Sequence, residues 1–470
     1  MVLLYSFRQQ IEDFMTNFLF KPKPNILVLD APMGSGKTKK IKQIILESTK
    51  PVIYITPLLE EASNVVGAIV DDKGRQVKDD LGYYMYDLNN PLSSKSFMLP
   101  NTNNSDGSKL EGIKHLINNK HNIASTHKLF SMFDYDVINL LQLNNYQLII
   151  DESLNVWNTL NIYEGFGDNK RTMLEDEKQE KGSGSRTDKE ILNLIENGVI
   201  EVDPIGLLYW QEDKFVVDDD LFFGRVKKLC DLKQLYLSNN RVVFWELNHV
   251  LLNCFDNIVI GTYMFEHSFM SHYLDVHGFD YKVEKFGNKP SFYKPLINIV
   301  QGKLNDIGEK DYSLSYNDLC IKRHTEHPKE TLRKNLDNFF KNKCKSKRGE
   351  RIWSCFKKVS PSIANNRYTS DWVAYNIKAT NDYRFVEHVA YLCNNFPNTY
   401  LVAMVTKRND RKFNDDLWAL QEMLQYIWRS RIRGNEDVKD LEDRKINLYI
   451  PSKRMRTLLE RWLNDEFEGV

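Results

Sequence analysis

The sequence predicts an α/β protein in which parallel β-sheets are covered by helices. Short, continuous apolar runs such as residues 25–29 and 148–150 have the composition of strands that are buried on both faces, which is typical of parallel sheets. Segments with helical periodicity separate these runs, so strands and helices alternate along the chain. A chain of 470 residues can hold about three domains of ordinary size, or two larger domains that carry insertions.

Composition excludes the fibrous and disordered classes of protein. Hydrophobic residues make up 42% of the chain and charged residues 27%, values close to those of average soluble globular proteins. The 64 Lys and Arg residues balance the 64 Asp and Glu residues, so the net charge does not indicate a nucleic-acid partner. Any basic binding surface must therefore be local.

Neither a membrane segment nor a disulfide or zinc framework is expected. No apolar run reaches the length of about 18 residues that a spanning helix needs, and residues 1–20 mix charged and apolar residues, unlike a signal peptide. The six cysteines form no CxxC or CxxH pair, so we expect free thiols. These features predict an intracellular, cytoplasmic protein with no membrane partner.

The expected elements begin with a helix that ends near Pro22. Two stretches, 93–109 and 171–190, are polar or highly charged and are expected to be exposed, mobile insertions. Between and after them, buried strands are expected at residues 25–29, 51–56, 122–124, 148–150 and 257–260.

A change in the pattern near residues 280–295 predicts the boundary between two domains. The first domain would cover residues 1–285, with an insertion at about 155–245, and the second would cover residues 286–470.

Residues 30–38, DAPMGSGKT, have the form of a phosphate-binding loop between a buried strand and a helix. Glycines allow a backbone path whose N–H groups surround phosphates, and the helix N-terminus adds its dipole. The loop predicts binding of ATP and Mg²⁺, with Lys37 at the β- and γ-phosphates and Thr38 at the metal. The expected nucleotide-binding residues are Gly34, Ser35, Gly36, Lys37 and Thr38, and Gln9 in the opening helix is added to them.

Residues 148–153, LIIDES, form an apolar strand that ends in two carboxylates. This is the expected form of a second nucleotide-binding motif. Asp151 would bind magnesium and the nucleotide, and Glu152 would deprotonate the water that attacks the γ-phosphate.

Five ordered segments together resemble the first RecA-like domain of superfamily 2 (DEAD/DEAH-like) helicases. The resemblance implies two RecA-like domains of the P-loop NTPase fold, an ATP-binding one followed by a helicase one. It also implies that Pro57 and Thr126 contact nucleic acid and that the Gly-Thr-Tyr segment couples hydrolysis to movement, although Pro57 and Thr126 also fit ordinary turns. The segments are DAPMGSGKT, YITP (54–57), STH (125–127), IIDES and IGTYMFEHS (260–268).

Two later segments resemble motifs of the second helicase domain. Residues 375–384, YNIKATNDYR, resemble the motif in which Thr380 and Asn381 would face nucleic acid. Residues 425–433, QYIWRSRIR, resemble the arginine-finger motif, with Gln425 and Arg429 in the expected places. The second arginine is Arg433 or Arg431, and a continuous helix would place Gln425, Arg429 and Arg433 on one face. A solvated basic helix face is the alternative.

Residues 341–358 contain eight basic residues and one acidic residue. Cations interleaved with aromatic residues suit phosphate neutralisation and base stacking. Lys345, Lys347, Arg348 and Trp353 are therefore candidate nucleic-acid contacts, with a solubilising surface helix as the alternative. Segments across residues 350–465 resemble helicases encoded by bacteriophages and mobile elements, which implies a role in viral DNA replication or recombination in the host cytoplasm.

The residues and the resemblance together predict a nucleic-acid-dependent ATPase of the helicase type. Its expected partners are DNA with a single-stranded region and replication proteins. Two alternatives stay open: an ATP-driven DNA packaging motor, and an ATP-dependent nucleic-acid-binding switch or loader that does not unwind.

Overall fold

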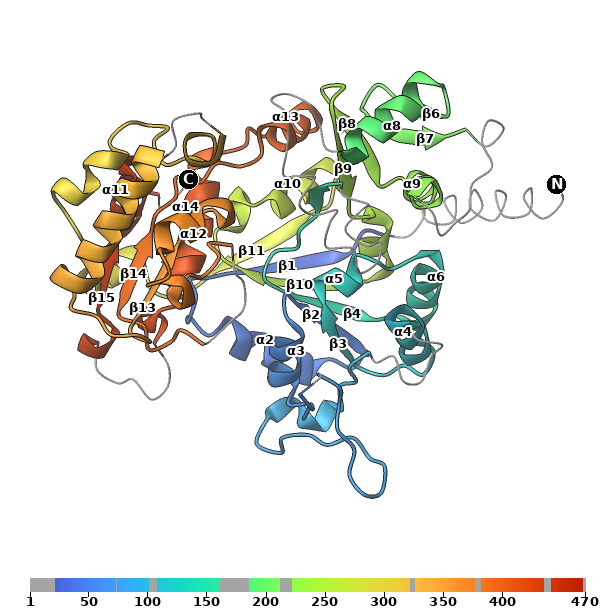
Figure 1. Ribbon diagram of the computed structural model, residues 1–470. Helices are drawn as coiled ribbons and strands as arrows, with labels where there is room; N and C mark the ends of the chain where they lie inside the picture. Colours follow the sequence, from blue (N-terminus) through green and yellow to red (C-terminus); the bar gives the residue numbers. More distant parts are fainter. Residues whose placement is uncertain are drawn as a thin grey trace.

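The computed structural model describes residues 22–72, 74–100, 108–160, 186–211, 222–321, 326–376, 382–434 and 441–467. These residues form two parallel sheets flanked by helices, which confirms the predicted α/β fold (Figure 1). The helix expected before Pro22 lies outside the described residues, as do residues 101–107 and 171–185 of the two predicted insertions.

The first sheet has six parallel strands, and five of them are the predicted ones. The sixth, at 281–285, was not predicted. Because all strands are parallel, their carboxyl ends lie at one edge, where Asp30, Thr56 and Asp151 end three strands. The order across the sheet is β11 (Tyr281–Lys285), β1 (Asn25–Asp30), β10 (Asn257–Thr262), β4 (Gln147–Asp151), β2 (Val52–Thr56) and β3 (Ile123–Thr126).

Both faces of this sheet are buried. Successive residues of each strand point to opposite faces, so each strand contributes apolar side chains to two clusters. In β4, Leu148 and Ile150 belong to one core cluster and Ile149 to another. The Ile149 face is covered by α2 (Lys37–Glu47) and α3 (Leu59–Val66). The opposite face is covered by α4 (Lys109–Asn118), α6 (Tyr135–Asn144) and α10 (Phe269–Val276), and the short α5 (His127–Phe130) follows β3.

Between β4 and β10 the chain forms a small antiparallel unit with its own apolar cluster. In Figure 1 this unit lies beside the first sheet, at the end opposite to the second sheet. Its elements are β5 (Trp157–Thr159), α8 (Arg186–Glu196), β6 (Ile200–Val202), β7 (Leu208–Trp210), α9 (Phe222–Asp231), β8 (Leu235–Ser238) and β9 (Val242–Glu246).

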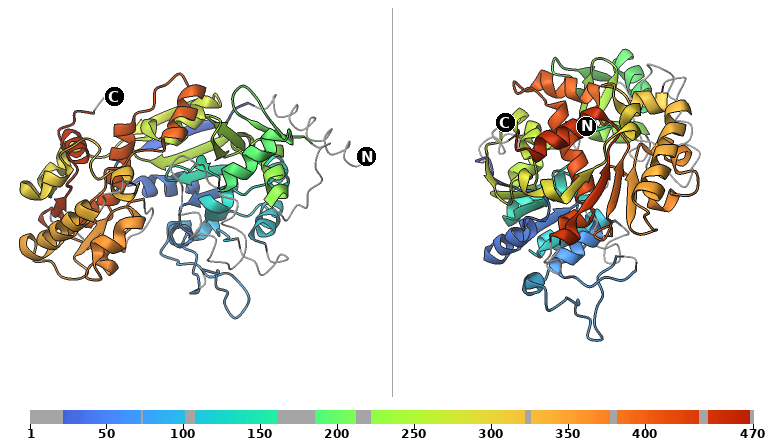
Figure 2. Two further views of the ribbon diagram at one scale, coloured as in Figure 1. Left: turned by 45° about the horizontal axis from the view of Figure 1, so that its top comes forward. Right: turned by 90° about the vertical axis from the view of Figure 1, so that its left-hand side faces the viewer.

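The second sheet has four parallel strands, and its helices group with it on one side of the molecule (Figure 2). Its order is β12 (Ile297–Ile299), β15 (Ile446–Tyr449), β14 (His388–Tyr391) and β13 (Arg351–Ser354). The helices are α11 (Glu326–Asp337), α12 (Ser360–Ala364), α14 (Asp415–Ile427) and α15 (Lys453–Leu463).

The prediction of an exposed insertion at 93–109 is wrong for residues 97–99. Phe97 is fully buried. The Met98 amide donates to the Asn122 carbonyl at 2.8 Å, and the Ala124 amide donates to the Met98 carbonyl at 3.0 Å. This segment therefore pairs with the free edge of β3, a position that its polar composition did not indicate.

The helix α13 (Thr399–Arg408) follows β14 in the sequence but packs against the first domain. Leu401, Met404 and Val405 belong to the same apolar cluster as Val28 and Ile150 of the first sheet. At the end of α13, the buried Arg408 guanidinium pairs with the buried Glu246 carboxylate of β9. His277 Nε2 lies 2.9 Å from the other Glu246 oxygen.

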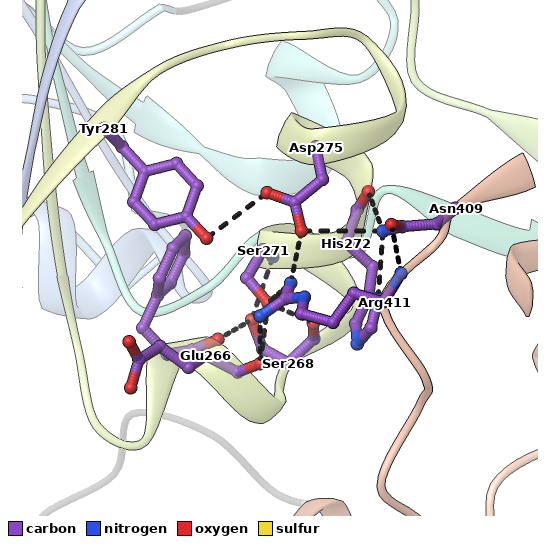
Figure 3. Close-up of polar contacts among 9 residues, drawn as sticks. Glu266, Ser268, Ser271, His272, Asp275, Tyr281, Asn409 and Arg411 are labelled. Carbon is purple, nitrogen blue, oxygen red and sulfur yellow. Dashed lines mark hydrogen bonds and ion pairs between the residues drawn. The ribbon is translucent and has the colours of Figure 1, made fainter. Parts of the chain in front are cut away.

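A second polar contact follows α13 and also joins the domains (Figure 3). The Arg411 guanidinium donates to the Glu266 carbonyl and to the Ser271 hydroxyl, each at 2.8 Å, and pairs with Asp275 at 2.7 Å. The Asn409 amide lies 3.1 Å from His272 Nδ1. The two contacts therefore hold α13 and the chain that follows it against the first domain and its insertion.

The Glu246–Arg408 pair predicts a measurable loss of stability when Arg408 is replaced. Arg408→Met would leave the buried Glu246 carboxylate with two hydrogen-bond partners, His277 and the Trp157 indole, but without its cationic guanidinium partner. Removing one partner of a buried ion pair costs about 3–5 kcal/mol. We expect a loss of this size in the free energy of unfolding measured in urea at pH 7. Lys407→Met, at an exposed neighbour in the same helix, is the matched control and should cost less than about 1 kcal/mol.

The loss of unfolding free energy caused by Arg408→Met should depend on pH. Burial alone would raise the pKa of Glu246, but hydrogen bonding with His277 and the charge of Arg408 outweigh it and hold the pKa at about 2. A depressed carboxyl pKa contributes stability above the ordinary value of 4.5, and this stability is lost as the pH falls towards 2. The difference between wild type and Arg408→Met should therefore shrink in that range, and a constant difference would contradict the assignment.

Candidate functional site

The loop between β1 and α2 has the backbone of a phosphate-binding loop. Gly34 and Gly36 have φ values of +81° and +86°, in the left-handed region that side chains disfavour. Gly36 is followed directly by Lys37, the first residue of α2, so the helix N-terminus points to the inside of the loop. The predicted residues Ser35 and Thr38 lie in the same turn.

Lys37 is almost completely buried, and its ammonium donates to the carbonyl oxygens of Ala31 and Pro32 at 2.5 Å and 3.2 Å. Burial lowers the pKa of Lys37, while the nearby carboxylates of Glu152 and Asp151 raise it. A buried cation held by loop carbonyls is suited to an anionic ligand, because phosphate oxygens would supply the charge that the carbonyls lack.

Asp151 is the last residue of β4, and its buried carboxylate accepts a hydrogen bond from the Tyr54 hydroxyl at 2.7 Å. Burial, together with the charges of Glu152 and Glu61, raises the pKa of Asp151 to about 7. A nearby divalent cation would favour the ionised form. Within the described ranges no three His, Cys, Asp or Glu side chains converge as metal ligands. The Thr38 hydroxyl and the Asp151 carboxylate are oxygen donors of the kind that Mg²⁺ prefers.

Glu152 and Ser153 are hydrogen-bonded to the carboxyl end of β10 at the same sheet edge. Glu152 has a φ of +65°, and its amide donates to the Gly261 carbonyl at 2.8 Å. The Ser153 hydroxyl donates to the Thr262 hydroxyl at 3.0 Å. The next residue, Tyr263, accepts hydrogen bonds from two side chains of the second domain, Gln421 at 2.7 Å and Trp462 at 2.8 Å. The Gly-Thr-Tyr segment thus contacts both the acidic strand end and the second domain.

Residues 425–433 do not form one continuous helix, so the condition under which Gln425, Arg429 and Arg433 would share one helix face is not met. The helix α14 ends at Ile427, and residues 431–433 form a separate 3-10 turn, η11 (Arg431–Arg433). Gln425 and Arg429 are buried nevertheless. The Arg429 guanidinium is in reach of the charges of Glu152 and Glu61, which raise its pKa against the larger, lowering effect of burial.

Arg433 and Arg431 lie in different surroundings. The Arg433 carbonyl is so close to Gly34 that a Cβ atom there would lie 2.7 Å from it. The charge of Arg433 also lowers the pKa of Lys37, after the larger effects of burial and of the nearby carboxylates. Arg431 instead pairs with Glu387 at 2.6 Å and donates to the Lys445 carbonyl at 2.6 Å. Of the two arginines, the geometry places Arg433 at the phosphate-binding loop.

Sequence reasoning missed one carboxylate of this site, Glu61, in the first turn of α3. The Thr56 hydroxyl at the end of β2 donates to Glu61 at 2.6 Å. Burial raises the pKa of Glu61, and the charge of Glu152 adds to this effect, while those of Arg429 and Arg433 oppose it. The available signal was the position of Glu61, one turn after a strand end that also holds Pro57.

Three of the predicted site residues, Gln9, Thr380 and Asn381, lie outside the described residues. Of the others, Pro57 and Gln425 line a cavity between the domains. The Thr126 hydroxyl caps α5 by accepting from the Leu129 amide at 3.3 Å, which is the local structural role that a turn threonine can have.

The basic segment 341–358 does not form the surface helix of the alternative interpretation, because β13 occupies residues 351–354 within it. Trp353 lies in β13, is fully buried, and donates its indole N–H to the Tyr368 carbonyl at 2.7 Å. Its prediction as a stacking residue is wrong, because β13 is buried on both faces and places the ring in the core. Lys345, Lys347 and Arg348 are exposed on the loop between η8 (Asn338–Lys343) and β13, so they stay candidate phosphate contacts.

Comparisons with known proteins give three similarities. Residues 291–463 match the family model described as the YonV C-terminal Rossmann-like domain, in agreement with the second parallel sheet. Over 467 residues the chain is 29% identical to the SPbeta prophage-derived uncharacterized protein YonV of Bacillus subtilis (strain 168), covering 94% of this chain and 99% of that protein. The structure of Xpd4 from S. tokodaii is similar with a TM-score of 0.47 and 11% identity, over 98% of this chain and 97% of that one.

The contact between Gly34 and Arg433 predicts different effects for two glycine substitutions in the loop. Both Gly34→Ala and Gly36→Ala strain the backbone, but only the new Cβ at position 34 would collide with the second domain, since nothing lies within 4 Å of position 36. Hydrogen exchange at residues 431–434 should therefore speed up in Gly34→Ala and stay near the wild-type rate in Gly36→Ala. Equal exchange rates in the two variants would contradict the observed contact.

Proposed function

We propose that this protein is an ATP hydrolase of the helicase type, which uses ATP to move along or unwind nucleic acid. The observation that carries the proposal is the convergence of charges from both domains at one sheet edge. Lys37, Asp151 and Glu152 come from the first domain, and Arg429 and Arg433 come from the second. A site shared between two domains can link hydrolysis to a change in their relative position.

Each residue has a role that follows from its position. The loop amides and Lys37 bind the phosphates, and Thr38 and Asp151 would hold Mg²⁺, which when bound neutralises charge on the phosphate oxygens. Glu152 orients the attacking water and accepts its proton. Arg429 and Arg433 stabilise the charge that develops on the γ-phosphate in the transition state. Gln425, buried in α14, is proposed to sense the γ-phosphate together with these arginines.

Coupling to nucleic acid is proposed through the segment after β10 and the strand ends beside it. Tyr263 joins Thr262 to Gln421 and Trp462 of the second domain, so a change at the nucleotide alters an interdomain contact. The resemblance to superfamily 2 helicases supports nucleic-acid contacts at Pro57 and Thr126. Similarity to a prophage-derived protein supports a phage role, with DNA as the expected track and replication proteins as expected partners in the host cytoplasm. No helix among the described residues has the length and apolar character needed to cross a membrane.

The proposal is tested by ATP turnover of the purified full-length protein with and without single-stranded DNA, single-stranded RNA and forked duplexes. We expect turnover to rise severalfold with one of these nucleic acids, and to fall at least about 100-fold in Lys37→Ala and in Glu152→Gln. Strand separation is followed on the forked duplex.

Two outcomes would overturn the proposal in different ways. Turnover that depends on Lys37 but ignores every nucleic acid would favour an ATP-dependent switch or loader. Turnover that persists in both variants would show that the phosphate-binding loop is not the hydrolytic site.

Glu61 predicts a further effect on nucleotide affinity. Its carboxylate attracts Arg429 and Arg433 and repels an incoming phosphate, so Glu61→Gln should tighten ATP binding by about five- to thirtyfold. A unit charge several Å away at an effective dielectric constant near 20 is worth on the order of 1–2 kcal/mol. Glu60→Gln, at an exposed position of the same helix turn, is the matched control. Binding titrations that give unchanged or weaker affinity in Glu61→Gln would contradict this role.

A further inference from the structure

A cavity of about 980 Å³ lies where the first domain, its insertion and the second domain meet. We propose that this cavity binds unpaired nucleobases of a single strand, with the phosphate backbone outside. The proposal rests on the proposed function, because the strand is the same nucleic-acid partner. It goes beyond that function by assigning a site at which the bases, not only the backbone, are held.

The charges of the cavity wall do not select for phosphate. Two lysines, Lys128 and Lys228, are balanced by two carboxylates, Asp134 and Glu422. Amides and hydroxyls make up most of the remaining polar wall. Amide side chains can both donate and accept hydrogen bonds, as the edges of nucleobases do. This lining favours a neutral ligand that carries both hydrogen-bond donors and hydrogen-bond acceptors over a free phosphate.

Aromatic rings supply the other requirement for base binding. Trp245 from the insertion, Phe269 from α10 and Trp418 from α14 all line the cavity, and each is only partly buried. Phe269 and Trp418 meet edge to face, with ring centroids 6.1 Å apart and an interplanar angle of 62°. One face of Phe269 is already stacked on Phe413, with ring centroids 4.6 Å apart. Trp245 and Trp418 are therefore the rings on which we expect a base to stack, whatever its sequence. The volume also lies within the range of about 300–1,000 Å³ of known ligand pockets.

The cavity wall is hydrogen-bonded to the nucleotide site. His127 Nε2 lies 2.9 Å from the Asp151 carbonyl oxygen, and Ser153 bonds to Thr262. Gln421, on the opposite wall, donates to Tyr263. All three wall residues thus contact the backbone or side chains that hold Asp151 and the coupling segment, so an occupant of the cavity is placed to influence hydrolysis.

The test compares two strands of equal length and charge, oligothymidylate and the same backbone with abasic sites in place of the bases. Binding is measured by fluorescence anisotropy at one fixed salt concentration, because backbone binding depends on salt. Wild type should bind the strand with bases at least tenfold tighter. Trp418→Ala should lose about five- to hundredfold in affinity for that strand and little for the abasic one.

Two further variants keep the test decisive. Asn158→Ala removes an exposed amide of the cavity wall without touching the core, and should reduce the preference for bases even if Trp418→Ala folds poorly. Tyr83→Ala removes an aromatic ring that is 71% exposed and lies outside the cavity wall, so it should leave the preference unchanged.

The outcomes separate this proposal from the function on which it rests. Equal affinity of wild type for the two strands would overturn the base site alone, since the backbone would then carry all binding. Binding of neither strand would overturn the nucleic-acid function and the base site with it.

Discussion

Burial of opposite charges at the carboxyl edge of the first sheet is the constraint on which the rest of the structure depends. The Lys37 ammonium and the Asp151 carboxylate are both nearly inaccessible. Burial lowers the pKa of Lys37 and raises the pKa of Asp151, so it favours the neutral form of each group. A buried charge is unfavourable unless an opposite charge or hydrogen bonds compensate for its lost hydration. Phosphates and a divalent cation would satisfy both groups at once, which supports the proposed nucleotide site at this edge.

The second domain is held close to this edge by contacts on both sides of it. Tyr263 and the Gly34–Arg433 contact lie next to the nucleotide site, whereas Arg408 and Arg411 fix α13 further away. In the second group, the Arg408–Glu246 pair and the apolar face of α13 are buried, whereas the Arg411–Asp275 pair is partly exposed.

Much of this could be predicted from the sequence because the information is local. Apolar runs that end in Asp30 or Asp151 identify parallel strands, and the glycines and Lys37 identify the loop between a strand and a helix. The positions that sequence reasoning misjudged depend on contacts far apart in the chain. Residues 97–99 pair with β3, Trp353 fills a core made by several elements, and Glu61 reaches the site only through the packing of α3. The place of Arg433 was open because a turn, not a continuous helix, sets its direction.

The central claim is that the second domain completes the hydrolytic site. Its most direct test is the rate at which bound ATP is hydrolysed in a single turnover by wild type, Arg433→Ala and Arg431→Ala. The account predicts a loss of about a thousandfold in Arg433→Ala, with ATP affinity changed only a few-fold, because an arginine at the γ-phosphate acts on the transition state. Arg431→Ala should stay near the wild-type rate, since Arg431 pairs with Glu387 inside the second domain. A wild-type rate in Arg433→Ala, or a larger loss in Arg431→Ala, would contradict the account.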